Sequence, residues 1–295
     1  MTQSILGFVG GSGFYNLPGL ENPRWEKVAS PWGAPSDDIL FAEIGGLPIR
    51  FLPRHGRGHR LSPSAINYRA NIDALKRVGV TDLVSISACG SLKEAYAPGH
   101  FVLPDQFIDR TFAREKSFFG SGLVAHVAMG DPVSPGLVGA IEAAARSEAI
   151  AYTRGGTYLV MEGPQFSTRA ESNLYRSWGC DVIGMTNMPE AKLAREAEIC
   201  YAVVAMVTDY DCWREDHRDV DISDILRVMK ENSEKAARLA FRLARDFPRE
   251  HPPCPVGSDK ALEFAIITAP EARDPALVAK LDAVAGRVLA GARAS

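Results

Sequence analysis

The 295-residue chain lacks the sequence features of several large classes of protein. It has no block of basic residues and no interleaving of basic with aromatic residues, and its formal charge is −3, so nucleic acid is not an expected partner. No apolar run is long enough to cross a bilayer, and the N-terminus shows no signal-peptide pattern. We therefore expect no membrane association and a cytoplasmic location.

Cysteine is also scarce. The five cysteines are scattered, odd in number and without a C-x-x-C pair, which argues against a disulfide framework or a zinc knuckle and favours reduced thiols. His55 and His59 have the H-x-x-x-H spacing of some metal ligands, but Gly56 and Gly58 disfavour the helix that such a site needs. No metal site is predicted.

The composition is that of a globular protein with a large core, because 46% of the residues are hydrophobic and 23% are charged. Short, β-branched apolar runs predict strands at 5–9, 39–44, 49–52, 82–87, 101–103, 156–161, 182–183 and 202–207. Helical spacing predicts helices that begin at Ser62-Pro63, Pro189 and Ser223, and one more through Leu277, Leu281, Val284 and Val288.

This pattern predicts an α/β protein, a single domain over residues 1–295 with a central mixed β-sheet flanked by helices. The predicted core covers about residues 5–247. A proline-rich linker then begins at 248, and a C-terminal helical extension completes the segment 248–295.

Asp209 and Asp211 follow directly after the apolar run 202–207, which reads as a strand buried on both faces. In open α/β sheets, ligands bind at the carboxyl ends of such strands. A carboxyl group held partly out of water there can keep a proton near neutral pH. Asp is also common in turns and at helix starts, so this segment alone leaves both roles open.

Two further segments suggest an anion site. Gly10-Gly11-Ser12-Gly13 follows the first strand, and it fits a plain tight turn as well as a phosphate cradle. Segment 54–60 contains three Arg and two His and is interrupted by Gly56 and Gly58. Binding of an oxyanion by a bidentate Arg and an imidazole is the favoured interpretation of that segment.

Three more segments suggest a sugar and an aromatic ring. The small, donor-rich segment 87–91 ends one strand, and segment 161–171 leaves another with Phe166 as a ring-stacking face, although a lone Phe more often belongs to a core. Met185-Thr186 could place a thioether and a hydroxyl against a sugar. Together with the carboxylates, these parts suit a nucleoside and an anion.

The same segments occur, in order, in a known family. They are GGSG at 10–13, RHGRGH at 54–59, NYRAN at 67–71, ACGS at 88–91, DQFIDRT at 105–111, EGP with Phe-Ser at 162–167, and TDYDCW at 208–213. The chain thus resembles the trimeric purine nucleoside phosphorylase family, and within it most closely the 5'-methylthioadenosine phosphorylases. The resemblance covers about residues 5–247. It implies a purine nucleoside phosphorylase-like fold and a homotrimer whose active site is shared between subunits.

The resemblance also implies a reaction in purine and methionine salvage. It is the reversible phosphorolysis of 5'-methylthioadenosine to adenine and 5-methylthioribose 1-phosphate, with inorganic phosphate as co-substrate and no cofactor. The implied phosphate-binding residues are Ser12, Arg54, His55, Ser87, Ala88 and Thr186. The implied substrate-binding residues are Phe166, Met185, Asp209, Tyr210, Asp211, His59, Ile222, Ile225 and Leu226, and His126 from a neighbouring subunit. Asp209 is the implied catalytic residue, and Ser167 and Ile222 are the implied specificity residues.

Edge chemistry favours a 6-aminopurine, because a carboxyl group at Asp209 can accept from the N6 amino group and donate to N7. Apolar contacts from Ile222 and its neighbours favour a 5'-methylthio group, whereas His59 could serve a 5'-hydroxyl, which makes adenosine a poorer second substrate. The alternatives are a phosphorylase for 6-oxopurine nucleosides or methylthioinosine, a phosphate-independent nucleosidase, and a catalytically silent binding protein.

Overall fold

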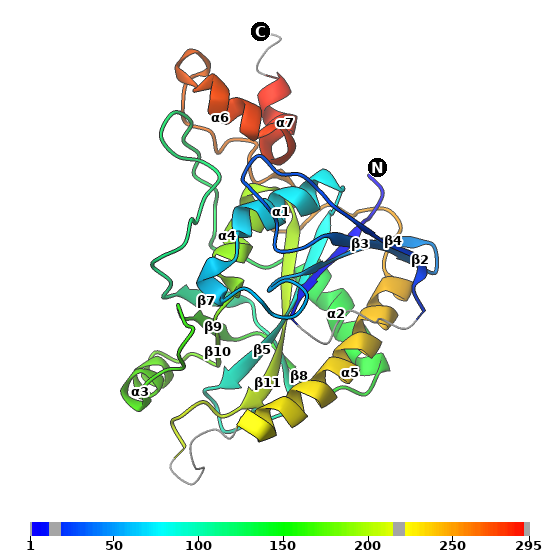
Figure 1. Ribbon diagram of the computed structural model, residues 1–295, viewed down its shortest axis with the longest axis vertical. Helices are drawn as coiled ribbons and strands as arrows, with labels where there is room; N and C mark the ends of the chain where they lie inside the picture. Colours follow the sequence, from blue (N-terminus) through cyan, green and yellow to red (C-terminus); the bar gives the residue numbers. More distant parts are fainter. Residues whose placement is uncertain (1, 12–18, 215–221, 292–295) are drawn as a thin grey trace.

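The computed structural model describes residues 2–11, 19–214 and 222–291, apart from the side chains of 222–225 and 291 (Figure 1). Within them, one mixed sheet has eleven strands. They are β1 (Leu6–Gly10), β2 (Glu21–Glu26), β3 (Ile39–Ile44), β4 (Leu47–Pro53), β5 (Asp82–Ser91), β6 (Phe101–Leu103), β7 (Gln106–Asp109), β8 (Tyr152–Arg154), β9 (Thr157–Val160), β10 (Val182–Gly184) and β11 (Cys200–Asp209). The α-helices are α1 (Tyr68–Arg77), α2 (Pro135–Ser147), α3 (Arg169–Ser177), α4 (Asn187–Glu196), α5 (Ile222–Asp246), α6 (Pro275–Lys280) and α7 (Asp282–Gly291).

The centre of the sheet is parallel, and this parallel core positions the site. β5 pairs with β1 on one side and with β11 on the other, so that Leu6, Asp82 and Cys200 stand side by side. The three strands therefore end at the same edge, where open α/β sheets bind ligands. The strand order across the sheet is β2-β3-β4-β1-β5-β10-β9-β7; β11 pairs with β5 off this path, and β6 and β8 continue beyond β11.

Two hydrophobic cores enclose the sheet, one on each face. Along β11, side chains at 201, 203, 205 and 207 enter the core shared with α1, α4 and α7, whereas those at 202, 204 and 206 enter the core shared with α2 and α5. Alternation along a strand requires this division, and burial of both faces explains the unbroken apolar run. The predicted α/β fold with a central mixed sheet and flanking helices is confirmed.

Side-chain caps set the starts of α1, α2 and α3, and Asp274 caps α6 in the same way. The Asn67 side chain accepts from the Ala70 N–H at 3.1 Å to start α1, and Ser134 precedes Pro135 at the start of α2. At α3, Thr168 and Glu171 form a reciprocal capping box. The predicted helix start at 62–63 gives only a 3₁₀ turn, because Asn67 caps the α-helix five residues later.

The predicted strands are present, with ends that differ by a few residues. β2, β7, β8, α2 and α3 have no counterpart in the sequence prediction. β2 is exposed along nearly its whole length and so lacks an apolar signal, and the Gly- and Ala-rich α2 shows little contrast between its faces. Helix α4 ends at Glu196, and Glu198 adopts a positive φ just before β11 begins.

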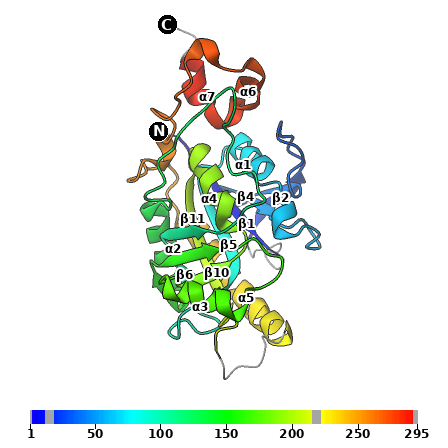
Figure 2. The ribbon, with the colours of Figure 1, turned by 90° about the vertical axis from the view of Figure 1, so that its left-hand side faces the viewer.

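The C-terminal segment packs on the rest of the fold. Its backbone pairs with the N-terminal residues, through Ser4 N–H to the Arg249 carbonyl and His251 N–H to the Thr2 carbonyl, both at 2.9 Å. The single predicted C-terminal helix is two helices, α6 and α7, separated at Leu281. Buried side chains of α7 join the core of α1, and both views place α6 and α7 at the end of the molecule opposite α3 (Figures 1 and 2). No helix within the described ranges has the length and apolarity needed to span a membrane.

Candidate active site

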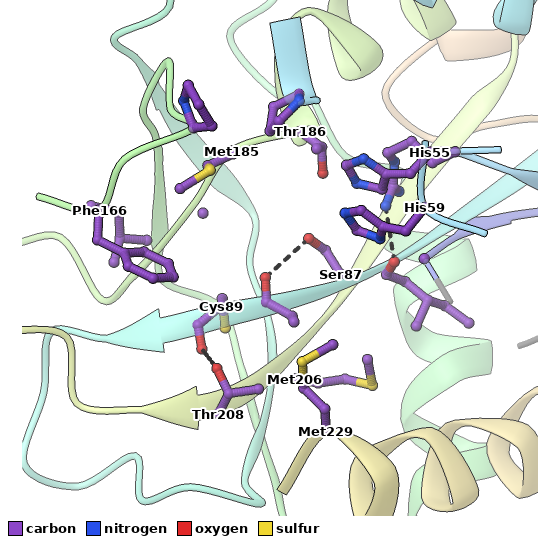
Figure 3. A pocket seen from close by; sticks show the side chains of 18 of the residues that line it. His55, His59, Ser87, Cys89, Phe166, Met185, Thr186, Met206, Thr208 and Met229 are labelled. Carbon is purple, nitrogen blue, oxygen red and sulfur yellow. Dashed lines mark hydrogen bonds between the residues drawn. The ribbon is translucent and has the colours of Figure 1, made fainter. Parts of the chain in front are cut away.

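A cavity of about 560 Å³ lies at the carboxyl ends of β5, β10 and β11 (Figure 3). Ten residues predicted from the sequence line it, namely Arg54, His55, His59, Ser87, Ala88, Phe166, Met185, Thr186, Asp209 and Asp211. The outermost two, Arg54 and Asp211, are 157 positions apart in the sequence, and the sheet brings all ten together. A cavity of this size suits a small organic molecule with an anion beside it.

The two carboxylates lie where β11 leaves its regular register. The pairing with β5 shifts between Val207 and Asp209, and such a bulge turns side chains into a new direction. Oδ2 of Asp209 is 2.6 Å from the Thr208 hydroxyl, and its Oδ1 accepts from the Asp211 N–H at 2.8 Å. The space opposite them is tight, because a Cβ at Gly90 would lie 3.1 Å from Oδ1 of Asp209 and would require that side chain to shift.

Both carboxyl groups favour the protonated form more than an exposed Asp does. Burial raises the pKa of Asp209, and the hydrogen bonds from Thr208 and from the Asp211 N–H offset only part of this. Burial, together with the neighbouring charge of Asp209, raises the pKa of Asp211 to about 6. Oδ2 of Asp211 is buried without a hydrogen-bond partner among the described residues. The site can therefore offer a proton near neutral pH.

Imidazole and hydroxyl groups surround the other end of the cavity (Figure 3). The His55 ring stacks on His59 with centroids 4.1 Å apart, and its Nδ1 lies 2.8 Å from the Leu61 carbonyl. A carbonyl can only accept, so Nδ1 carries the hydrogen. Burial, with the nearby charges of Arg54 and His59, lowers the pKa of His55 to about 4, and the ring is neutral at pH 7. The Thr186 hydroxyl makes no capping bond to α4 and is left for a ligand.

Arg54 lies at this end but is fully buried and already engaged. Its Nε donates to Glu190 Oε2 at 2.8 Å, and its Nη2 lies 3.2 Å from Glu190 Oε1. The bidentate pairing that the sequence suggested for an oxyanion is thus made with Glu190. Nη1 donates to the Ile86 carbonyl at 3.1 Å, which leaves its second N–H for the cavity.

Phe166 and Met185 form the apolar end (Figure 3). Phe166 is 68% exposed, as a stacking face that awaits a partner would be. Met185 packs closely over the turn at Gly163, where φ is +70° and a Cβ would lie 2.5 Å from the Met185 sulfur. Glycine is therefore needed at 163 for both its backbone conformation and the close approach of Met185.

Seven residues predicted from the resemblance are not among the described residues that line the cavity. Tyr210 and Ser167 lie beside it, and the Ser167 hydroxyl points to the Met161 sulfur at 3.3 Å. His126 and Leu226 are exposed. Ser12 lies outside the described residues, as do the side chains of Ile222 and Ile225.

Met206, Met229 and Ser233 also line the cavity, and sequence reasoning did not assign them to the site. Met229 and Ser233 are one turn apart on α5, so they share one face of the helix. Met229 lies in the helix that the sequence predicts from Ser223. The helical period gives that face, but it does not show which turn meets a ligand.

Metal coordination receives no support here. In the part of the chain that the structure describes, no group of three or more His, Cys, Asp or Glu side chains could hold a metal ion. His55 and His59 stack face to face and do not converge on a common point.

Comparison with known proteins agrees with this geometry. Residues 5–245 match the sequence profile of the Phosphorylase superfamily. The chain belongs to this superfamily. Superfamily members with high similarity include proteins named S-methyl-5'-thioadenosine phosphorylase from Bradyrhizobium diazoefficiens, 67% identical over 99% of this chain and 100% of the relative, and from Cereibacter sphaeroides, 60% identical over 98% and 100%.

Solved structures of the superfamily share the fold. A methylthioadenosine phosphorylase from an antarctic soil metagenomic library superposes with a TM-score of 0.90 at 44% identity, covering 96% of this chain and 99% of the other. An engineered variant of the adenosine/methylthioadenosine phosphorylase from Schistosoma mansoni, in complex with adenine, superposes with a TM-score of 0.82 at 33% identity, covering 88% and 97%.

Proposed function

We propose that this protein is a pentosyltransferase that catalyses the reversible phosphorolysis of 5'-methylthioadenosine to adenine and 5-methylthioribose 1-phosphate. One observation carries the proposal: a single cavity combines two partly buried carboxyl groups, an apolar aromatic end and an end lined by hydroxyl and imidazole groups, and burial raises the pKa of both carboxyl groups. Relatives named S-methyl-5'-thioadenosine phosphorylase, at 60–67% identity over nearly the whole chain, support it.

Phosphate would occupy the end formed by His55, Ser87, Ala88 and Thr186, with the free N–H of Arg54 behind it, and Ser12 is proposed on sequence grounds. An oxygen of phosphate attacks C1' of the sugar as the bond from C1' to N9 breaks. The bonding electrons pass to the purine, and the phosphate beside the sugar stabilises its developing positive charge.

Asp209 would act as the general acid. A protonated carboxyl group near N7 would donate its proton to the departing purine, and burial raises the pKa of Asp209, which favours the protonated form. The second oxygen accepts from the N6 amino group. Asp211 and Tyr210 would complete the contacts to the purine, with Ser167 setting the preference for a 6-aminopurine.

The purine would pack on Phe166, and the sugar and its substituent would lie between Met185 and the start of α5. A methylthio group needs apolar contact, which the thioethers of Met206 and Met229 offer in the cavity. Ile222, Ile225 and Leu226 are proposed to add to this contact on sequence grounds. His59 lines the same cavity and would serve a 5'-hydroxyl, which makes adenosine a second, poorer substrate.

The proposed assembly is a cytoplasmic homotrimer whose active site is shared between subunits, acting in purine and methionine salvage without a cofactor. Exposed apolar side chains support an interface, since Phe112, Phe264 and Ile267 are 81%, 90% and 65% exposed. His126 is tied to this surface by its N–H bond to Ala265 and lies outside the cavity of its own chain. We propose residues 1–295 as one domain.

A substrate panel tests the proposal. Purine release from methylthioadenosine, adenosine and methylthioinosine is measured with and without phosphate. We expect release of adenine that depends on phosphate and is fastest for methylthioadenosine. Equal turnover in phosphate-free buffer would identify a nucleosidase, and a preference for methylthioinosine would identify a 6-oxopurine enzyme.

A further inference from the structure

Glu190 is a buried carboxylate that does not line the cavity but holds a residue that does. The Arg54 and Glu190 side chains are 2% and 3% exposed, and their closest contact is 2.8 Å. Arg54 also contacts the Val9 carbonyl through Nη2 at 3.2 Å, and its Nη2 donates to Ser85 Oγ. Every donor edge of the guanidinium except one N–H on Nη1 therefore has a partner among the described residues.

A second layer of hydrogen bonds fixes Glu190 itself. The Tyr201 hydroxyl donates to Glu190 Oε1 at 2.8 Å, and Asn187 Nδ2 lies 2.9 Å from both Tyr201 Oη and Ser85 Oγ. These groups come from β5, α4 and β11, so three elements hold the carboxylate in place. Buried ion pairs are retained only when their hydrogen bonds are satisfied, and this one meets that requirement.

The charges make the arrangement unusual for an anion site. Arg54 is the only Arg or Lys among the described residues that line the cavity, and Glu190 cancels its charge. His55 is neutral at pH 7. The described part of the site can therefore offer an anion directed N–H and O–H donors but little net positive charge, so the direction of each donor would matter more than net charge.

We propose that Glu190 is a positioning residue for phosphorolysis: it fixes the plane of the Arg54 guanidinium so that the free N–H on Nη1 points at phosphate. This inference rests on the proposed function, because it requires phosphate at that end of the cavity. It adds a residue outside the cavity whose effect passes wholly through Arg54.

The test is steady-state kinetics of Glu190→Gln at varied phosphate and varied methylthioadenosine. The amide keeps the shape but places an NH₂ against one guanidinium N–H, so Arg54 loses its fixed orientation. We expect the KM for phosphate to rise about ten-fold or more, which corresponds to about 1.4 kcal/mol. The KM for methylthioadenosine should change less than two-fold, on the order of the scatter of such measurements.

Glu196→Gln is the matched control, since it lies on the same helix and is also buried. Its carboxylate accepts from the Phe118 N–H at 2.7 Å and from Ser117, away from the cavity. We expect altered stability with an unchanged KM for phosphate. A rise equal to that of Glu190→Gln would overturn the inference, because burial of an amide in α4 would then be the cause.

Two further variants show whether the effect passes through Arg54. Tyr201→Phe removes one hydrogen bond to Glu190 and should raise the KM for phosphate by a smaller factor than Glu190→Gln. This variant tests the inference if Glu190→Gln fails to fold. In an Arg54→Met background, Glu190→Gln should have no further effect on that KM. A wild-type enzyme indifferent to phosphate would refute the proposed function. Phosphate dependence with an unchanged KM in both Glu190→Gln and Tyr201→Phe would refute the positioning role alone.

Discussion

Replacement of Asp209 by Asn separates proton donation from shape. The Asn side chain can still accept from the Asp211 N–H, now 2.8 Å from Oδ1. Its NH₂ would meet the Thr208 hydroxyl, which can turn to donate to the Cys89 carbonyl at 3.1 Å. The packing is thus retained, and we expect the free energy of unfolding to change by less than about 1 kcal/mol.

Activity should respond far more than stability. Asn has no acidic proton to give to N7, and loss of a general acid costs about 10²- to 10⁴-fold in rate, or about 3–5.5 kcal/mol in the activation barrier. The assay is kcat/KM for methylthioadenosine at saturating phosphate. The KM for phosphate should be nearly unchanged, because the Asp209 carboxyl group is hydrogen-bonded to Thr208 and to the Asp211 N–H and not to the residues proposed to hold phosphate.

Methylthioinosine provides the internal control for Asp209→Asn. Its O6 is an acceptor that an amide NH₂ can satisfy, so activity on this substrate should fall less than activity on methylthioadenosine. Equal loss on both substrates would refute the matching of Asp209 to the amino-bearing edge. Loss of folding cooperativity in the variant would show instead that the carboxyl group is structural.

Three other changes have equally definite outcomes. Burial raises the pKa of Asp211 to about 6, so its contribution to stability is full below about pH 4 and is lost as pH rises through 6. Between about pH 4.5 and 7, the free energy of unfolding in urea should therefore change less in Asp211→Asn than in the wild type. An equal change in both proteins would contradict this. Gly163→Ala should raise the KM for the nucleoside by displacing Met185, whereas Gly179→Ala, with φ +81° but open space around the new methyl group, should alter stability alone. His126→Ala should leave the melting temperature within about 2 °C, because the side chain is exposed, yet raise the KM for methylthioadenosine if a neighbouring chain supplies it; an unchanged KM would remove His126 from the site.

Much of the fold followed from local patterns. A strand buried on both faces has a continuous β-branched run, and the run at 202–207 therefore located β11 and the carboxylates after it. The exposed strand β2 has no such signal, since its alternate faces both meet water. Helix α2 is not predicted from the sequence, because alanine and glycine occupy much of both its faces and the apolar periodicity is weak.

The site was predictable where a residue type carries its own chemistry. Asp209, His55 and Phe166 could be singled out from the sequence on chemical grounds. Glu190 could not, because an acidic residue in the first turn of a helix has a sufficient local explanation, and its partner Arg54 is 136 positions away. Pairings at that distance depend on the path of the sheet, which no local pattern contains.

The exchange of backbone hydrogen bonds between residues 2–4 and 249–251 has a practical consequence for anyone who shortens this protein. The superfamily profile stops at residue 245, which invites a deletion there. Such a truncation would remove the hydrogen-bond partners of residues 2–4, which precede β1. It would also expose the apolar side chains of α1 that α7 covers. Purification tags belong after the final helix, and a shortened gene should yield aggregated product.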